Sequence, residues 1–419
     1  MRLWRHLTLR GRVLPICGIL LTVASLGLGQ RDMAWVGLLL ILLPVLGLLL
    51  VTSTRLRMSC VREVEPSQCP LGETMAVRTT LNRGQGMPIG VLRFEETVPR
   101  ALGLRPRFSV HTLARRWRRS IDYTLTGRAR GRYTVGPMLV RVCDPFGTAV
   151  SDHQFAATNQ VMVTPRVWPL QHLGKVAGTG RSGETIPQQI GTQGQDDVLI
   201  REYRQGDDLR RVHWRSSAHQ GDLMVRREEQ SWDPAATVLL DSRAERHSGL
   251  GAQGSFEWSV SAAASVCSHL LRSGYQVRLA DASGPVMTSA EVDLGVALER
   301  SLTTLTDQRI GKEEDLVAAA RACTGRQAGE TVVAILGRLS QADVLPLDVA
   351  RTGHTQALAL VLDTDSFTAR RFRGTPEQAD EHDQVVDQLR GQGWSVVTVH
   401  HGDTVPAAWQ GFEQIGASR

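Results

Sequence analysis

Two uncharged apolar runs constrain the fold of this chain more than any other feature of its sequence. They cover residues 13–29 and 33–52, and only residues 30–32, which include one arginine and one aspartate, separate them. As a helix, the second run would measure about 30 Å, the thickness of the hydrocarbon core of a bilayer. Because the connection is too short to fold by itself, residues 1–57 are predicted to form a tight transmembrane helical hairpin with both outer ends on one side.

Arginines indicate the side of the membrane on which the hairpin ends. Those outside the two runs are Arg2, Arg5, Arg10 and Arg12 before the first, and Arg55, Arg57 and Arg62 after the second. The connection has only Arg31 beside Asp32. The positive-inside rule therefore places both outer ends in the cytoplasm. We expect a two-pass protein of the cytoplasmic membrane with its globular part in the cytoplasm.

The alternative is that the basic start and the first run form a cleaved secretory signal. No small-x-small cleavage pattern of the usual kind closes the run, which disfavours this alternative. Residues 33–52 would in that case still anchor the chain, and its bulk would still face the cytoplasm.

Residues 58–166 contain short alternating segments of apolar and polar residues, separated by glycine and proline. The clearest segments are 76–81, 91–98, 120–126, 138–142 and 160–164. Short strands with turns at this spacing predict a β-sandwich-like domain. Two motifs fall within it, R-G-x-Y-x-x-G-P at residues 130–137 and D-P-F-G at residues 144–147. Both are interpreted as turns of the fold rather than as chemistry.

The same region is strongly basic. From residue 100 to residue 132 the chain has ten arginines and a single acidic residue, Asp122. Two interpretations remain open: the arginines contact the anionic inner leaflet, where each would contribute about 1 kcal/mol, or they are solvated and contact nothing. Nucleic acid is not an expected partner, because the region has no recognised nucleic-acid motif.

Residues 167–197 are rich in glycine, glutamine and proline without periodicity, which predicts a linker or long surface loop. From residue 236 to residue 419, strand and helix patterns alternate, with strands expected at 237–241, 276–280, 331–336, 357–362 and 395–400. This alternation predicts an α/β doubly wound domain, with a mostly parallel sheet covered on both faces. The helix at residues 256–272 has one apolar stripe and is expected to pack on the core.

Residues 198–235 form the segment with the densest mixture of charges. A strand is expected at residues 200–204, followed by a short helix that Asp207 or Asp208 caps and Gly221 ends. The mixed charge indicates either internal ion pairs that fix the segment or a patch that binds a partner. Trp214 is expected to pack the short helix onto the sheet.

In this segment the chain resembles the signature of the bacterial domain-of-unknown-function family 58. The pattern R-x-Y-x-x-G-D-x-x-R-x-x-x-W-x-x-S-A is formed by Arg201, Tyr203, Gly206, Asp207, Arg210, Trp214, Ser217 and Ala218. The two upstream turn motifs are similar to the segment that this family carries before its signature. The resemblance implies a membrane protein with a von Willebrand A-like domain, associated with a MoxR-type AAA+ ATPase and often with a transglutaminase-like membrane protein.

The implied domain raises the question of a metal site. Von Willebrand A domains that bind Mg²⁺ place D-x-S-x-S at the end of the first strand, because a hard cation takes carboxylate and hydroxyl oxygens. Asp241 fits the first position, but Arg243 and Glu245 occupy the two hydroxyl positions, and Ser242 and Ser248 are out of register. We expect Asp241 to pair with Arg243 or a neighbouring arginine, and Asp241 is a metal ligand only if a degenerate site binds Mg²⁺. The six cysteines show no C-x-x-C or regular spacing, so no zinc site or disulfide framework is expected. No cofactor is expected either.

The favoured function is a non-enzymatic, membrane-anchored scaffold or adaptor. It would work with the MoxR-type AAA+ ATPase in the assembly or maturation of proteins at the cytoplasmic membrane. One alternative is a metal-dependent ligand-binding von Willebrand A module, which lacks the hydroxyls it needs. Another is an uncharacterised hydrolase, for which no spacing among His213, His219, His400 and His401 selects a nucleophile and its base.

Partner docking is expected in the signature segment. Neighbouring helical residues point about 100° apart, so Arg210 and Arg211 cannot face the same acidic groups. We expect Arg210 to pair internally with Asp207 or Glu202. Arg211 and Arg215, at i and i+4, would form an exposed basic edge for an acidic surface of the partner.

Overall fold

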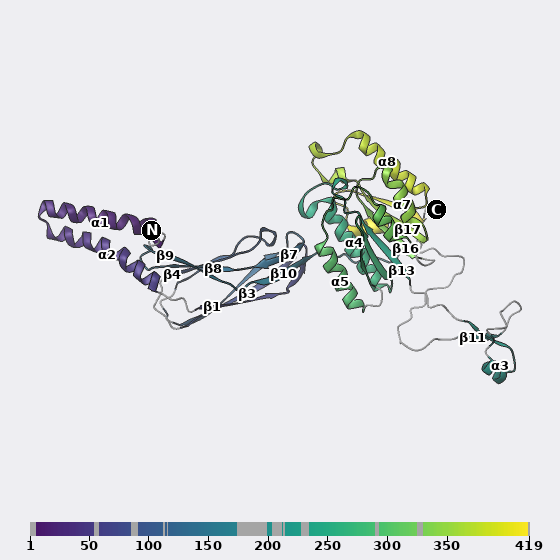
Figure 1. Ribbon diagram of the computed structural model, residues 1–419, viewed down its shortest axis with the longest axis horizontal. Coiled ribbons are helices and arrows are strands. Elements are labelled where there is room, and N and C mark those ends of the chain that lie inside the picture. Colours follow the sequence, from purple (N-terminus) through teal and green to yellow (C-terminus); the bar gives the residue numbers. More distant parts are fainter. Residues whose placement is uncertain are drawn as a thin grey trace.

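The computed structural model describes residues 6–53, 58–84, 91–111, 114, 116–173, 199–202, 212, 214–227, 234–289, 293–324 and 330–417. Along the longest axis, a helical hairpin is followed by antiparallel β sheets and then by a mixed α/β sheet whose strands are mostly parallel (Figure 1). This architecture confirms the predicted fold class.

The hairpin consists of α1 (Leu9–Leu28) and α2 (Arg31–Ser53). By length and composition, both helices are apolar enough to cross a membrane. Gly29 ends α1 in the left-handed region, with φ at +67°, which a residue without Cβ adopts readily. A Cβ atom on Gly18 would lie 2.6 Å from the carbonyl oxygen of Gly37, so the two helix backbones approach closely at these glycines. Small residues at the contact are typical of helices that pack within a membrane.

The β domain forms the middle of the molecule. Its strands are β1 (Met58–Glu65), β2 (Gln68–Pro70), β3 (Thr74–Arg83), β4 (Val91–Glu96), β5 (Arg107–His111), β6 (Trp117–Thr126), β7 (Gly131–Val135), β8 (Met138–Cys143), β9 (Val150–Phe155) and β10 (Asn159–Thr164). The sheet β1-β3-β6 packs against the sheet β5-β4-β8-β9 through residues such as Leu81 and Phe94. The other end of the sheet β1-β3-β6 packs against the sheet β2-β10-β7 through residues such as Val77 and Val163. These packed layers are the predicted sandwich-like arrangement.

A buried ion pair lies between the layers of the β domain. The side chains of Arg62 and Glu96 are both 0% exposed, and their closest atoms, Nη2 and Oε1, are 2.6 Å apart. Arg62 also donates to the carbonyl oxygen of Val135 at 3.1 Å and to Oδ1 of Asn159 at 3.1 Å. Tyr123 donates its hydroxyl proton to Glu96 at 3.0 Å. Both charged side chains are therefore hydrogen-bonded as well as paired, which is the condition for burying charge in a protein core.

Removing one partner of this pair should be far more costly than removing both. We expect Arg62→Ala to lower the free energy of unfolding by about 3–5 kcal/mol, because it leaves Glu96 as an uncompensated buried charge. The double variant Arg62→Met/Glu96→Leu should recover most of that loss. Urea unfolding of the full chain in detergent measures both. As a control, Arg78→Ala breaks the exposed pair with Asp122 and should leave the midpoint unchanged; equal losses for Arg62→Ala and the double variant would contradict the prediction.

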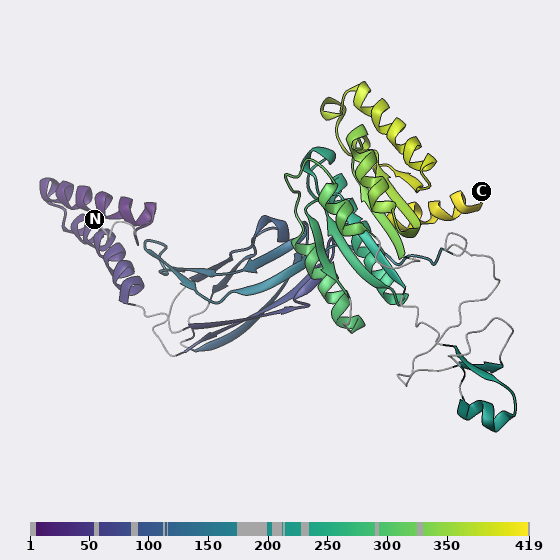
Figure 2. The same ribbon diagram turned by 45° about the vertical axis from the view of Figure 1, so that its right-hand side comes forward.

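The α/β domain follows at the far end of the molecule (Figure 2). Its elements are β13 (Ala235–Leu240), α4 (Ser255–Arg272), β14 (Gln276–Asp281), β15 (Gly284–Thr288), α5 (Leu294–Asp307), α6 (Val317–Cys323), β16 (Glu330–Leu336), α7 (Val344–Arg351), β17 (His354–Leu362), α8 (Pro376–Gly391), β18 (Ser395–Val399) and α9 (Val405–Ala417). The strand order is β15-β14-β13-β16-β17-β18. Only β15 runs antiparallel to its neighbour within this sheet.

Helices cover both faces of this sheet, as predicted for a doubly wound domain. On one face, α4, α5 and α9 pack against side chains such as Val238 and Leu360. On the other face, α6, α7 and α8 pack against side chains such as Leu239 and Ala334. Consecutive residues of each central strand therefore point into different cores, which explains why these strands are continuously apolar.

Residues 167–173, at the start of the predicted linker, pack against the α/β domain. The backbone N–H of Trp168 donates to Oγ of Ser265 at 3.0 Å, and the indole N–H of Trp409 donates to the carbonyl oxygen of Gln171 at 2.9 Å. This part of the chain is held on α4 and α9. Residues 174–197 of the predicted linker lie outside the described residues.

Candidate functional site

The candidate site lies at the carboxyl ends of β13 and β16, where the strand order reverses. From β13 the chain continues to β14 on one side of the sheet, whereas β16, β17 and β18 extend the other side. In doubly wound sheets, loops diverge at such a point and leave a crevice in which ligands bind. The first residues after these two strands therefore determine what the crevice can hold.

Asp241 follows β13 directly and is fully buried. Its Oδ1 accepts the backbone N–H of Arg243 at 3.1 Å and the side-chain Nε–H of Arg243 at 2.9 Å. Its Oδ2 accepts Nη2–H of Arg243 at 2.9 Å and the backbone N–H of Gly337, after β16, at 3.3 Å. The predicted pairing of Asp241 with Arg243 is confirmed.

Arg243 is 1% exposed and fills the crevice with its guanidinium. Besides the bidentate contact with Asp241, its Nη1 donates to Oδ1 of Asp343 at 2.5 Å. Asp343 lies in η6 (Gln341–Asp343), which follows β16. One internal cation thus bridges two buried carboxylates from loops on both sides of the reversal point.

The charges of this cluster fix each other's ionisation. Burial alone would raise the pKa of Asp241, but the hydrogen bonds and charge of Arg243 outweigh burial and hold the pKa below its ordinary value. Burial likewise acts against the charge of Arg243, and the two aspartates reverse this effect and raise its pKa. Asp241 and Arg243 are therefore both charged at neutral pH.

His247 contacts the backbone of Asp241 and so supports the cluster. Its Nε2 lies 2.8 Å from the carbonyl oxygen of Asp241, which can only accept, so Nε2 is the protonated nitrogen. Nδ1 then accepts from the hydroxyl of Ser255 at 3.0 Å, and that same oxygen accepts the N–H of Ser248 at 2.9 Å. Burial lowers the pKa of His247, so the ring is neutral in this network.

The cluster does not fit a divalent cation. Both oxygens of Asp241 are bound by the guanidinium, and Oγ of Ser242 accepts the N–H of Ala282 at 3.2 Å. Among the residues that the structure describes, no group of three or more histidine, cysteine, aspartate or glutamate side chains is placed to hold a metal ion. The positive charge that a metal would supply is supplied by Arg243.

Removing this cation should destabilise the α/β domain in a pH-dependent way. We expect Arg243→Ala to lower the free energy of unfolding by about 3–5 kcal/mol at neutral pH, because two buried carboxylates lose their counter-charge. In the natural protein, the contribution of Asp241 is present above its unfolded-state pKa and is lost as pH falls through the depressed folded-state pKa. In Arg243→Ala, burial without the arginine raises the pKa of Asp241. Mild acid should therefore narrow the difference in free energy of unfolding between the natural protein and the variant. Thermal unfolding of both proteins between neutral and mildly acidic pH tests this prediction. A difference in stability between the two proteins that widens in acid would contradict it.

Exposed apolar and basic side chains lie on two loops at the same edge of the sheet as the closed crevice. Leu250 is 97% exposed in the loop after β13, and Phe372 is 65% exposed in the loop after β17. The two loops are adjacent, since a Cβ atom on Gly249 would lie 2.7 Å from the carbonyl oxygen of Phe367. The guanidinium of Arg371 lies over the Phe372 ring, 4.7 Å from its centroid. We call the exposed residues Leu250, Arg370, Arg371, Phe372 and Arg373 the carboxyl-edge rim.

The R-G-x-Y-x-x-G-P motif joins the β domain to the α/β domain. Arg130, with a side chain 6% exposed, donates to both carboxylate oxygens of Glu257 on α4 at 2.9 and 3.0 Å. Its Nη1 also donates to the carbonyl oxygens of Leu305, Thr306 and Gln308 at 2.6, 3.0 and 2.7 Å. A cation is favourable there because the last carbonyls of α5 carry the negative end of the helix dipole. The motif is therefore an interdomain clamp as well as the predicted turn.

The clamp is continuous with the candidate site. Gln308, whose carbonyl oxygen Arg130 binds, donates its side-chain amide to Asp281 at the end of β14. Three residues on, Gly311 donates its N–H to the carbonyl oxygen of Ser242 at 2.7 Å. The segment 308–311 thus links the β domain to the residues beside Asp241.

Loss of the clamp should free the two domains from each other without unfolding either. We expect Arg130→Ala to broaden the distance distribution between spin labels at Leu104→Cys and Leu345→Cys, measured by electron–electron double resonance in a background without reactive native cysteines. Both label positions are exposed, at 85% and 73%. Arg132→Ala is the matched control, because its pair with Asp307 is exposed and should contribute little. An unchanged distance distribution for Arg130→Ala would show that Arg130 does not hold the two domains together.

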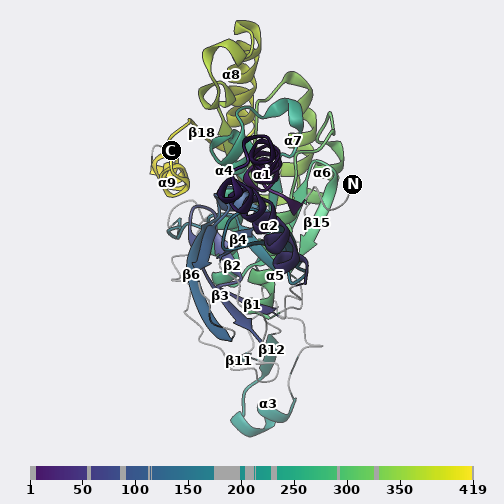
Figure 3. The same ribbon diagram turned by 90° about the vertical axis from the view of Figure 1, so that its left-hand side faces the viewer.

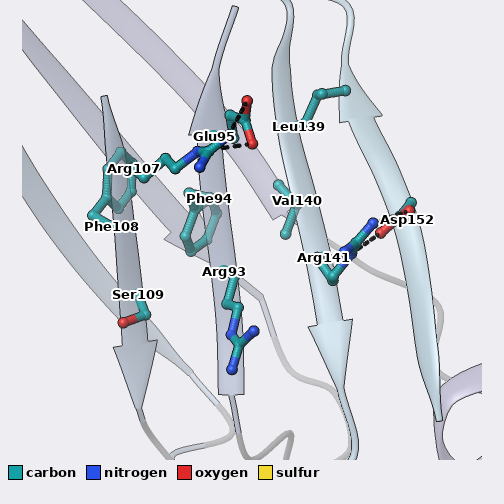
Figure 4. Close-up of a pocket in the computed structure, with 10 residues that line it drawn as sticks. All are labelled: Arg93, Phe94, Glu95, Arg107, Phe108, Ser109, Leu139, Val140, Arg141 and Asp152. Atoms are coloured by element: carbon teal, nitrogen blue, oxygen red, sulfur yellow. Dashed lines mark hydrogen bonds and ion pairs between the residues drawn. The ribbon is translucent and has the colours of Figure 1, made fainter. Parts of the chain in front are cut away.

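The β domain has a surface hollow of about 560 Å³ (Figure 4). Most of the charged side chains that line it are paired with each other. The hollow lies over the sheet β5-β4-β8-β9, where Arg107 pairs with Glu95, and Arg141 pairs with Asp152 at 2.7 Å. Arg93 lies directly across the strands from Arg141. The lining keeps one net positive charge, which suits an acidic surface better than a basic one.

The structure describes only part of the signature segment. Tyr203, Gly206, Asp207, Arg210 and Arg211 lie outside the described residues, as do the side chains of Arg201, Glu202 and Arg215. The expected internal pair of Arg210 and the expected basic edge therefore stay predictions. The described part consists of β11 (Leu199–Glu202), α3 (Trp214–Gln220) and β12 (Met224–Arg227), with β11 and β12 antiparallel.

The prediction that Trp214 packs the short helix onto a sheet is wrong. Trp214 is 71% exposed at the first position of α3, and Ala218 is exposed as well. The helix is held instead by Ser217, whose Oγ accepts the backbone N–H of Met224 at 2.8 Å. The two strands described beside α3, β11 and β12, have four residues each and form too small a sheet to bury an indole ring. The exposed aromatic side chain is available for contacts outside this unit.

The histidines considered for hydrolysis do not form a described catalytic group. His213 lies outside the described residues, and His219 is exposed on α3. His400 lies 3.7 Å from a carboxylate oxygen of Asp403 and 3.9 Å from one of Asp363, and its side chain is 59% exposed. These contacts are those of a surface imidazole between acids.

Fold and site together define a protein with two candidate membrane helices, a β domain and an α/β domain whose ligand crevice is closed by an internal ion-pair cluster. Residues 199–366 match the family model described as "Protein of unknown function DUF58". The chain therefore contains a DUF58 domain, which confirms the resemblance in the signature segment. No curated protein matches the chain.

Likenesses to solved structures are weak. The CARDB domain of a Pyrococcus furiosus protein is 12% identical to this chain. The match covers 26% of this chain and 93% of that domain, with a TM-score of 0.19. A beta-glucosidase from Listeria innocua is 12% identical, covers 26% of this chain and 16% of its own, and has a TM-score of 0.17. The beta-D-mannosidase from Dictyoglomus thermophilum is 8% identical, covers 82% of this chain and 35% of its own, and has a TM-score of 0.19. These scores do not show a shared fold.

Proposed function

We propose that the protein is a non-enzymatic, membrane-anchored adaptor whose von Willebrand A-like domain docks a protein partner. The observation that carries this proposal is the position of Arg243. Its guanidinium occupies the crevice in which an α/β domain of this kind would bind a metal or small ligand, and it is bound there by two buried carboxylates. Recognition is then left to the surface of the domain.

The carboxyl-edge rim is the proposed docking surface. Interfaces depend on a few aromatic, apolar and arginine side chains that become buried on binding, and the rim combines these types. Phe372 and Leu250 are its apolar members, and three arginines flank Phe372. This composition suits a partner with an acidic border around an apolar pocket.

The proposed partner and the proposed side of the membrane rest on the sequence. The signature resembles proteins associated with MoxR-type AAA+ ATPases, so such an ATPase, with client membrane proteins, is the proposed partner. Arginines at the outer ends of the two apolar runs favour a cytoplasmic position for the globular part. Assembly or maturation of proteins at the cytoplasmic membrane is the process that this arrangement would serve.

Rigid attachment supports an adaptor. Arg130 ties the α/β domain to the β domain through five hydrogen bonds, and its side chain is almost fully buried. A partner bound at the rim would therefore be held in a fixed orientation relative to the β domain. A tether that only localised a partner would not need such a joint.

Truncating the rim should weaken partner recovery without affecting the fold. We expect Phe372→Ala/Leu250→Ala to reduce co-purification of the ATPase from cross-linked native membranes, measured by quantitative mass spectrometry. A single interface hot spot costs about 2 kcal/mol, which is about thirtyfold in affinity. The thermal unfolding midpoint should not change, because both side chains are mostly exposed.

The control is Val296→Ala, which is 53% exposed near the start of α5, at the opposite edge of the sheet. It should leave recovery unchanged. Washing with a chelator separates the alternatives: an adaptor keeps its partner, whereas a metal-dependent module releases it and regains it with Mg²⁺. Release by chelator, or full recovery with the rim variant, would defeat the proposal.

A further inference from the structure

The D-P-F-G turn of the β domain contacts both helices of the hairpin. Thr8, which caps α1, donates its N–H to the carbonyl oxygen of Thr148 at 2.9 Å and its hydroxyl proton to that of Gly147 at 2.7 Å. A Cβ atom on Gly11 of α1 would lie 2.0 Å from the oxygen of Thr148. One on Gly47 of α2 would lie 2.4 Å from Oγ1 of Thr148. The turn is therefore in direct contact with helix backbone on both sides.

Asp144 gives the turn its shape. Its carboxylate is 3% exposed and accepts the N–H of Phe146 at 3.0 Å, the hydroxyl of Thr148 at 3.1 Å and the N–H of Ala149 at 2.6 Å. With these groups satisfied inside the turn, Pro145 and Phe146 project outward. Phe146 is 49% exposed and belongs to neither core of the β domain.

The contact points fix the depth of the turn. Gly47 lies 15 residues beyond Asp32, the last residue of the connection, which corresponds to about 22 Å along a helix. Gly11 lies 18 residues before Gly29, which corresponds to about 27 Å. The hydrocarbon core of a bilayer is about 30 Å thick. A turn that contacts the helices at these levels lies at the inner boundary of the acyl region.

We infer that residues 144–148 form a lipid-contact site, in which Pro145 and Phe146 enter the bilayer at the boundary between headgroups and acyl chains. An aromatic ring at this level behaves as an interfacial anchor. The inference rests on the membrane-spanning hairpin of the proposed function. It adds a third contact with the bilayer, supplied by the globular part of the chain.

The surroundings of the turn favour lipid over a protein partner. Leu46 and Leu49 of α2, at the same level as Gly47, are 46% and 58% exposed. Arg10 and Arg12 are exposed at the start of α1, where long basic side chains reach toward lipid phosphates. Apolar side chains with cations just outside them are the pattern of a membrane interface.

Fluorescence quenching by brominated lipid tests the inference on the full chain. Bimane is attached to Phe146→Cys, in a background without the exposed Cys17, after reconstitution into vesicles of phosphatidylcholine and phosphatidylglycerol. Leu49→Cys reports on the hairpin. Leu104→Cys, 85% exposed at the other end of the same domain, is the water-exposed control. A label at Pro145→Cys repeats the measurement if the change at Phe146 disturbs the turn.

We expect brominated lipid to quench labels at positions 49 and 146 to a similar degree, and to leave the label at 104 unquenched. Quenching at 49 without quenching at 146 or 145 would overturn the lipid contact and leave the membrane hairpin intact. Protection of position 146 from aqueous iodide without quenching by brominated lipid would mean that protein covers the turn, in these vesicles a second copy of the chain, and would also overturn the lipid contact. Absence of quenching at 49 would refute the membrane hairpin itself.

Discussion

The insertion of Arg130 at the end of α5 is the interaction on which the arrangement of the molecule depends. A guanidinium has five N–H donors in a fixed plane, and here it binds one carboxylate and three backbone carbonyls. Those carbonyls would otherwise remain without partners at the helix end. Because its side chain is almost fully buried, the contact gains strength from low dielectric and cannot be exchanged for water at low cost.

Buried arginine recurs at three joints of the protein. Arg62 joins the layers of the β domain, Arg130 joins the two domains, and Arg243 joins the loops at the reversal point of the sheet. Each forms a bidentate contact with a carboxylate and at least one further hydrogen bond. Arginine suits these positions because its planar fork matches a carboxylate and it stays charged when buried. Such pairs fix geometry more than they add net stability, since desolvation offsets much of their attraction.

Sequence patterns predicted the parts that depend on local periodicity. The central strands of the α/β domain and α4 lie within about three residues of their predicted bounds, because apolar runs and stripes identify them. The edge strand β15 was missed, because five residues beginning with glycine and proline give no strand pattern. The Asp241–Arg243 pair was predictable because its partners are only two positions apart in the sequence. Asp343 is 100 residues from Arg243 and Glu257 is 127 residues from Arg130, so no local pattern could reveal these contacts.

The β domain sets a distance as well as an orientation. Its strand β3 has ten residues, about 33 Å in length, and extends between the end near the hairpin and the end near the α/β domain (Figure 1). Viewed along the longest axis of the molecule, α1 and α2 lie in front of the β sheets (Figure 3). With the turn at residues 144–148 fixed against the hairpin and Arg130 fixed against α5, neither end is free to swing. In the proposed adaptor, the α/β domain with its closed crevice would then present its rim at a constant distance from the bilayer. For an adaptor, this constancy is the property that a flexible linker of the same length could not supply.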